Sequence, residues 1–167
     1  MMDSFFTLIL CSLMAGQSDM TSGHGTIIKQ QLQVNWRASD GQVHFDLTAP
    51  TAGWVAIGLN SGDELTGTYL IMTRVVEGQA EVVEHKVMSP GVYRPFHELG
   101  AETAVSNVHG SERKGNTTVS FSLPELNASP LAMPMQEGQS YMLLMAYSIS
   151  DDFQHHSIMR TSEVIQF

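Results

Sequence analysis

Cysteine is nearly absent from this chain of 167 residues, which contains only Cys11. A single thiol cannot form an intramolecular disulfide or build a Cys-x-x-Cys metal site. Stability must therefore come from an ordinary buried core, and a chain of this length with 43% hydrophobic residues can form one. Length and composition together predict a single domain.

Positive charge is also scarce. Eight Lys and Arg residues stand against 17 Asp and Glu residues, which gives a formal net charge of −9 at pH 7. The chain has no run of basic residues, and such an acidic protein repels phosphate backbones and anionic lipid surfaces. This balance argues against nucleic acid as a partner.

The short motifs of several enzyme classes are missing as well. The sequence contains no Gly-x-Ser-x-Gly nucleophile elbow, no glycine-rich phosphate loop and no His-Glu-x-x-His zinc motif. Adjacent carboxylates, such as Asp63 with Glu64, are usually solvated when they lie in loops. We therefore expect no catalytic activity of the chain's own, and at most a redox module that serves a partner enzyme.

No hydrophobic run reaches the length of about 20 residues that a membrane span requires. The longest run, Phe5 to Ala15, has about the length of a signal-peptide core and is followed by small and polar residues. Residues 1–20 are therefore predicted to be a signal peptide or an apolar leader; the alternative is an N-terminal strand or helix of the domain. Export would place the protein in the periplasm or outside the cell, with membrane association only through an uncleaved leader.

From about Thr26 onward apolar and polar residues alternate with a period of two, which is the signature of half-buried strands. Residues 32–37 and 43–47 predict a hairpin, and residues 53–60, apolar at both parities, predict a central strand covered on both faces. Further strands are expected in residues 69–88 (two strands, joined at 77–79), 117–123, 140–149 and 162–167. Such a series of short strands indicates an antiparallel sandwich or barrel.

Two long connections, residues 89–104 and 124–138, interrupt this rhythm with several Pro and Gly residues. Loops of this length are often functional, because rigid sheets can hold them over a pocket. They are candidates for the walls of a binding site.

Seven histidines and eleven methionines are many for a chain of this length. Imidazole and thioether are ligands of haem iron and of copper. His44 and His85 alternate with apolar residues on predicted strands and are expected to face solvent. Met133 and Met135 would suit cuprous copper, although one Met-x-Met pair is a weak signal.

Residues 150–160, SDDFQHHSIMR, concentrate polar groups near the C-terminus. Neighbours in an extended chain point to opposite sides, so His155 and His156 are not expected to bind one metal together. One can point inward while the other faces water. Arg160 is close enough in sequence to pair with Asp151, with Asp152 or with an anionic group of a ligand.

Four segments occur in the order GWVAIGLN, ELTGTYLIMTRV, HGSERKGNTTVSFSLP and YMLLMAYSISDDFQHHSIMRTSEV. Together they resemble the DOMON family, named for the N-terminal domain of dopamine beta-monooxygenase. The resemblance covers residues 28–167, within a predicted single domain of residues 26–167. It is carried by Gly53-Trp54, Gly67, Gly110-Ser111-Glu112, Thr117, Phe121, Ala146-Tyr147, and His156 with Arg160.

The resemblance implies an all-β, immunoglobulin-like antiparallel sandwich of about eight to ten strands with few or no helices. It also implies a pocket between the sheets for haem b or a sugar-like ligand, usually outside the cytoplasm. In cytochrome members such as the haem domain of cellobiose dehydrogenase, one Met and one His hold the iron. The His of those domains matches His156, with His155 as the neighbouring alternative.

The Met of those cytochrome domains lies just before the strand at Tyr69, where this sequence has Leu65 or a neighbour and no Met. A leucine cannot ligate iron, so the second ligand must come from elsewhere. Met72, His97 and His109 are the candidates. A pocket that holds a sugar, another small ligand or a five-coordinate haem is the remaining possibility.

Two hypotheses follow. In the first, the chain is a haem b electron-transfer module for a redox partner protein. His156 is then an axial ligand, Trp54 and Leu65 wall the pocket, and Arg160 neutralises a propionate. In the second, the chain is a non-catalytic module that binds a carbohydrate or other small ligand, with Trp54 stacking on it and the long loops supplying polar contacts.

Overall fold

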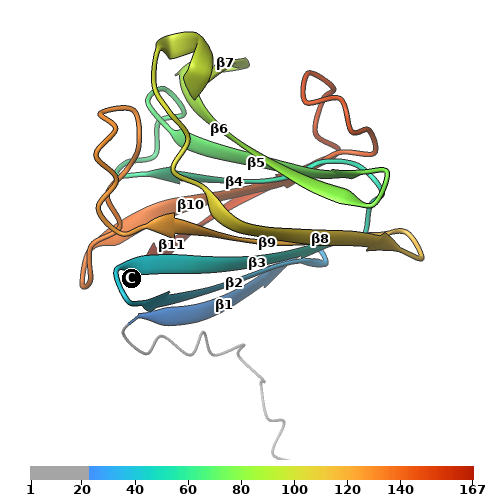
Figure 1. The fold of residues 1–167 in the computed structure, drawn as a ribbon, viewed down its shortest axis with the longest axis horizontal. Coiled ribbons are helices and arrows are strands. Elements are labelled where there is room, and N and C mark those ends of the chain that lie inside the picture. The colour runs from blue at the N-terminus through green and yellow to red at the C-terminus, as the bar shows by residue number, and fades with distance from the viewer. Residues whose placement is uncertain (1–22) are drawn as a thin grey trace, which may run out of the picture.

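The computed structural model describes residues 23–167, so the predicted leader at residues 1–20 lies outside the described residues. The described chain forms two antiparallel sheets that pack face to face (Figure 1). This arrangement confirms the predicted all-β sandwich. Within residues 23–167, no helix has the length and apolar character needed to cross a membrane.

The first sheet has five strands in the order β1-β2-β3-β9-β8. The second has six strands in the order β11-β10-β4-β5-β6-β7. The bounds are β1 His24–Lys29, β2 Leu32–Ser39, β3 Gln42–Ala49, β4 Val55–Asn60, β5 Tyr69–Val76, β6 Gln79–Ser89, β7 Val92–Pro95, β8 Ser106–Arg113, β9 Asn116–Pro124, β10 Ser140–Tyr147 and β11 Met159–Gln166, with the 3-10 helix η1 at Phe96–Leu99.

The eleven strands within residues 23–167 are more than the period-two pattern predicts, because β7 and β8 carry little apolar alternation. The first long connection, residues 89–104, contains the edge strand β7 and the helix η1. The second, residues 124–138, contains no strand after Pro124, the last residue of β9. The predicted hairpin is present as β2 and β3, joined at Asp40 and Gly41. Both turn residues have positive φ, as a two-residue hairpin turn of type I′ requires.

The main core fills the space between the sheets. Phe45 and Phe121 of the five-stranded sheet stack at a centroid distance of 5.4 Å, and Phe167 meets Phe45 edge to face. Tyr69 of β5 stacks on Phe96 of η1 at 5.5 Å, so the helix packs against an aromatic ring of the core. Bulky buried side chains therefore occupy the layer between the sheets.

Strand β4 is the central element of the six-stranded sheet, and all six of its residues are buried. This result confirms the prediction that a strand in residues 53–60 is covered on both faces. Val55, Ile57 and Leu59 point into the main core. Ala56 instead packs on the opposite side of the sheet with Met72 of β5, in a second apolar cluster. Something other than the five-stranded sheet must cover that outer face.

Figure 1 shows what covers it. The loop between β10 and β11 and the segment around β7 both rise from the six-stranded sheet on the side away from the five-stranded sheet. These two segments, far apart in the chain, therefore frame the outer face of the sheet.

Candidate functional site

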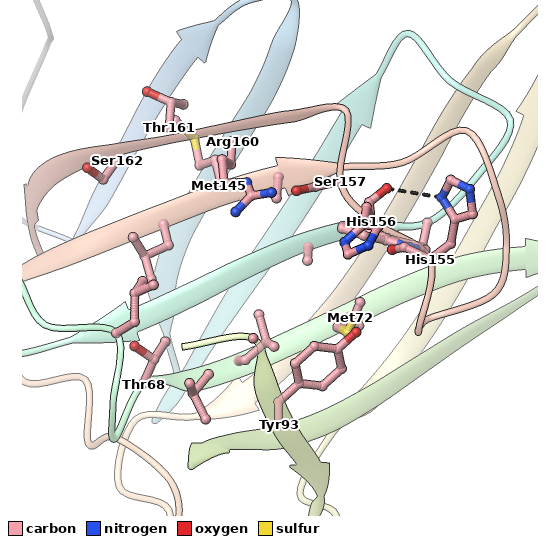
Figure 2. A pocket seen from close by; sticks show the side chains of 18 of the residues that line it. Thr68, Met72, Tyr93, Met145, His155, His156, Ser157, Arg160, Thr161 and Ser162 are labelled. Atoms are coloured by element: carbon pink, nitrogen blue, oxygen red, sulfur yellow. Dashed lines mark hydrogen bonds between the residues drawn. The ribbon is translucent and has the colours of Figure 1, made fainter. Parts of the chain in front are cut away.

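A pocket of about 440 Å³ lies on the outer face of the six-stranded sheet (Figure 2). Its lining includes Trp54, Ala56 and Met72, which form the second apolar cluster and not the main core. The expectation of a pocket between the sheets is therefore wrong. The reason is steric, because fully buried side chains such as Phe45 and Tyr69 fill the space between the sheets.

The floor of the pocket follows from the strand register. Met72 of β5 lies opposite Ala56 of β4, Ala56 lies opposite Ala146 of β10, and Ala146 lies opposite Arg160 of β11. Neighbouring strands are about 4.8 Å apart, so Met72 and Arg160 are separated by roughly 14 Å of sheet on which only two methyl groups stand. A short floor bounded by a thioether and a guanidinium is the result.

The next row across the sheet contains Gly58 of β4 between Leu70 of β5 and Leu144 of β10. A Cβ atom at Gly58 would lie 2.7 Å from Cγ2 of Thr68 and 3.3 Å from Leu144. The glycine therefore lets the segment before β5 close over the sheet beside the pocket. Because Ala56, Ala146 and Gly58 have small side chains or none, few atoms project from this part of the sheet into the pocket.

The segment before β5 forms one wall. The Gly67 N–H donates to the carbonyl of Val87 at 2.8 Å, and the Val87 N–H donates to the carbonyl of Thr68 at 3.0 Å. This pairing fixes the segment against β6. Leu65, in the same segment, lines the pocket and is 43% exposed, so it lies at the rim.

The loop between β10 and β11 forms the opposite wall and carries the histidine pair. Both His155 and His156 line the pocket. Figure 2 shows the ring of His156 on the pocket side of this loop, whereas the ring of His155 lies at its outer end, hydrogen bonded to the His156 carbonyl. Trp54 Nε1 donates to the carbonyl of His155 at 3.2 Å, so the strand that supplies the floor also holds the loop.

Phe153 anchors this loop to the far side of the outer face. The guanidinium of Arg74 lies 4.5 Å from the centre of the Phe153 ring, and the His85 ring meets that ring edge to face at 6.0 Å. The Tyr93 hydroxyl donates to the Phe153 carbonyl. Arg74 of β5 and His85 of β6 therefore hold the Phe153 ring, and Tyr93 of β7 holds its main-chain carbonyl.

His85 is buried, and the expectation that it faces solvent is wrong. Its position on the outer face was read correctly, but Tyr93 and Phe153 cover that part of the face. Its Nδ1 lies 3.0 Å from the Val83 carbonyl, an acceptor, so Nδ1 carries the proton. Burial lowers the pKa of His85, because the charged imidazolium loses its hydration.

Arg160 lies at the rim of the pocket with its side chain exposed. In residues 23–167 it has no ion pair, and neither Asp151 nor Asp152 bonds to it. The Asp151 carbonyl instead accepts from Arg74 Nη1 at 3.0 Å. Burial raises the pKa of the Asp151 carboxyl, and nearby Arg74 opposes that shift. Arg160 is thus available for an anionic group.

The structure brings Trp54, Leu65, Met72, His156 and Arg160 together around one pocket. The other two candidates for a second ligand lie elsewhere. His97 belongs to η1 and lines a separate cleft with Glu84 and Thr103, and His109 lies on β8 of the other sheet, opposite Ser120.

The methionine pair suggested for copper also lies away from this pocket. Met135 is buried in the main core, and Met133 packs against that core. No group of three or more His, Cys, Asp or Glu side chains in residues 23–167 is placed to hold a metal ion. A site for haem would have to rely on imidazole and thioether.

Sequence reasoning missed Ala56, Ala146, Tyr93, Phe153 and the buried Ser148 as parts of the site. The two alanines carried part of a signal, since the strand pairing puts them on one face of β4 and β10, but only the structure shows that this face is the outer one. The positions of Tyr93 and Phe153 carried none, because loop conformation decides them.

The comparisons with known proteins agree with this architecture. The family model described as DOMON domain matches residues 28–148. None of the curated protein sequences compared with the chain matches it significantly.

Two solved structures are similar in fold. The cytochrome domain of Myriococcum thermophilum cellobiose dehydrogenase has a TM-score of 0.58 at 11% identity, covering 86% of this chain and 82% of that chain. The cytochrome b domain of pyranose dehydrogenase from Coprinopsis cinerea has a TM-score of 0.57 at 11% identity, covering 86% and 80%. At this identity the likeness shows the fold alone, whereas the family model over residues 28–148 confirms the resemblance read from the sequence.

Proposed function

The chain belongs to the DOMON domain family, and from this premise we propose that it is an exported, non-catalytic haem b-binding electron-transfer module. The observation that carries the proposal is that the Met72 thioether, the His156 imidazole and the unpaired Arg160 guanidinium all line one pocket with apolar walls. Each of these three groups has a role in holding such a cofactor.

The donor set fits haem iron. Met72 and His156 both line the pocket, and Met with His is a known axial pair of electron-transfer haem proteins. The ring of His156 makes no hydrogen bond to another described residue, so its nitrogens are free to ligate. Met72 is only 2% exposed and its position on β5 is fixed by pairing with Ala56.

The walls and the rim fit the rest of the cofactor. Leu65 and Leu70 supply apolar surface, and Arg160 supplies a cation for a propionate. When bound, haem b would supply a one-electron carrier. The protein itself would bind the haem and keep water away from Met72. Its acidic surface, with a net charge of −9, favours a basic redox partner protein.

The second candidate is a module for a carbohydrate or another small ligand in the same outer pocket. It is supported by polar side chains along the lining, including Thr68, Ser157 and Ser162. However, Trp54 is only 4% exposed and its Nε1 is bonded to the loop, which leaves little ring surface for stacking on a sugar. The haem proposal uses more of the observed groups.

The test is a titration of the purified chain with hemin, followed by absorption. We expect a Soret band that shifts on reduction. The variant His156→Ala should lose this band, whereas His109→Ala, which alters a histidine on the other sheet, should keep it. The proposal fails if the wild-type chain stays colourless in excess hemin, and calorimetry with a glycan panel then tests the second candidate.

The second ligand is tested by a matched pair of methionine variants. Met72→Leu nearly conserves volume and removes only the sulfur, so we expect hemin binding to persist with the loss of the six-coordinate, low-spin spectrum. Met142→Leu, on β10 and outside the pocket lining, should leave the spectrum unchanged. If His97→Ala rather than Met72→Leu changes the spectrum, the assignment of Met72 is wrong.

A further inference from the structure

A buried hydroxyl organises the histidine loop. Ser148 is fully buried, and its Oγ lies 2.9 Å from Nδ1 of His155 and 2.9 Å from the carbonyl oxygen of His156. Nδ1 of His155 also lies 3.0 Å from that same carbonyl. The N–H of Ser150 approaches the hydroxyl as well, at 3.4 Å. Two donors thus converge on the main chain of His156.

The positions of the protons follow from what each group can do. The carbonyl oxygen of His156 can only accept, so a contact with His155 Nδ1 requires a proton on Nδ1. The Ser148 hydroxyl donates its one proton in a hydrogen bond to the His156 carbonyl. The lone pairs of the same hydroxyl accept from His155 Nδ1–H and from the Ser150 N–H. The opposite arrangement, with an Nδ1 lone pair facing the carbonyl lone pairs at 3.0 Å, would be repulsive.

From this geometry we propose that His155 is a positioning residue. In its Nδ1–H tautomer it acts together with Ser148 to hold the main chain of His156, so that the His156 imidazole stays directed into the pocket. The proposal rests on the proposed function for the role of His156, but the proton arrangement itself does not depend on a bound group.

Other contacts place the same segment from the opposite side. Trp54 Nε1 binds the His155 carbonyl, and the His155 N–H donates to the Asp152 carbonyl at 2.9 Å. The main-chain carbonyls of His155 and His156 and the His155 ring therefore all form hydrogen bonds. Of the two rings, only that of His156 has no hydrogen-bond partner among residues 23–167. Groups that hold the backbone of a ligand residue keep its side chain oriented for binding.

The first test uses the full chain without added hemin. Nitrogen-15 NMR at pH about 8.5, where an ordinary imidazole is neutral, reports the tautomer of each ring. We expect the Nδ1–H tautomer for His155, in contrast to the Nε2–H tautomer that histidine prefers in water. An Nε2–H tautomer at His155 overturns the proposal, whatever the chain does with hemin.

The second test uses two polar substitutions of His155, which is exposed, so that folding is not at risk. In His155→Asn the amide nitrogen replaces Nδ1, whereas in His155→Gln it replaces Nε2 instead. We expect hemin affinity near wild type for Asn and a loss of roughly 10–100-fold for Gln and for Ser148→Ala, the range typical of groups that support metal ligands. Equal affinities for Asn and Gln overturn the proposal.

The outcomes separate the two proposals. If His155→Asn loses the imidazole-bound spectrum while His156→Ala keeps it, His155 is itself the ligand and the positioning role is wrong. If the wild-type chain binds no hemin, the proposed function fails, but the tautomer still decides the inference. In that case the amide shift of Ser157, whose N–H shares a peptide group with the held His156 carbonyl, should lie close to wild type in the Asn variant and differ in the Gln variant, and the reverse overturns the inference.

Discussion

Gly53→Ala should both destabilise the domain and loosen the histidine loop. Gly53 precedes Trp54, whose main chain pairs with the end of β10: the Trp54 N–H donates to the Ser150 carbonyl at 3.0 Å, and the Ser148 N–H donates to the Trp54 carbonyl at 2.9 Å. A Cβ atom at Gly53 would lie 2.6 Å from the Ser148 carbonyl oxygen and nearer still to the Ser150 nitrogen. These are backbone atoms that cannot rotate away.

The magnitude follows from overpacking in a rigid site. Extra methyl groups in a packed region cost about 1–3 kcal/mol. For a domain of this size that cost lowers Tm by roughly 2–12 °C, at about 2–4 °C per kcal/mol. The control is Gly62→Ala, because a Cβ at Gly62 meets nothing within 4 Å and the backbone there does not require glycine. That variant should match wild type or gain up to about 1 kcal/mol from reduced freedom of the unfolded chain.

Two assays check this prediction. Thermal unfolding followed by circular dichroism compares the three proteins, and hydrogen exchange measures the amide of His155, which is bonded to the Asp152 carbonyl. We expect a lower Tm and faster exchange at His155 only in Gly53→Ala. A Tm for Gly53→Ala equal to or above that of Gly62→Ala would refute the claim that the start of β4 packs directly on the Ser148–Ser150 backbone.

Two further predictions concern the outer face. Ala146→Leu should weaken hemin binding at least 10-fold, because the larger side chain stands on the pocket floor. Its free energy of urea unfolding should stay within about 1 kcal/mol of wild type, because the face is open there; unchanged binding would contradict the assigned floor. Because burial holds the folded pKa of His85 below its unfolded value of about 6.5, the unfolded state takes up the proton first. The contribution of His85 to the free energy of unfolding should therefore be full above pH about 6.5 and fall as the pH drops below it. Urea unfolding at a series of pH values should show a weaker fall for His85→Phe. Parallel curves of unfolding free energy against pH for the two proteins would contradict a buried neutral His85.

Much of the fold was readable from alternation and turn chemistry. Residues 32–37 and 43–47 alternate around Asp40-Gly41, and the structure pairs them as β2 and β3. The doubly apolar run at residues 53–60 became the fully buried strand β4. Strand β8 was missed because polar residues dominate it, and its place is set by pairing with β9 rather than by its own pattern.

The sequence predicted residues that line the pocket, but it did not predict on which face of the sheet the pocket lies. Parity put Met72 on one face of β5, and the register shows that this face is the outer one, beside Ala56. Sequence alone could not say which face lies inside, because both faces of β4 are apolar. His85 shows the same limit, since only the loop carrying Phe153 turns an outer position into a buried one.

The resemblance implies that the axial Met of the cytochrome members matches Leu65 or a neighbour here, and the proposed haem site uses Met72 instead. Leu65 lies in an exposed segment at the rim, whereas Met72 lies in a strand whose backbone is fixed by pairing on both sides, with Ala56 and with Val83. A thioether on such a strand loses little freedom on ligation, because the ladder has already ordered its backbone. Its neighbour on the floor is the methyl group of Ala56, and Trp54 belongs to the same cluster, so Met72 lies among apolar groups. A ligand moved from the loop to the strand would therefore keep the chemistry of the pair and gain a better ordered support.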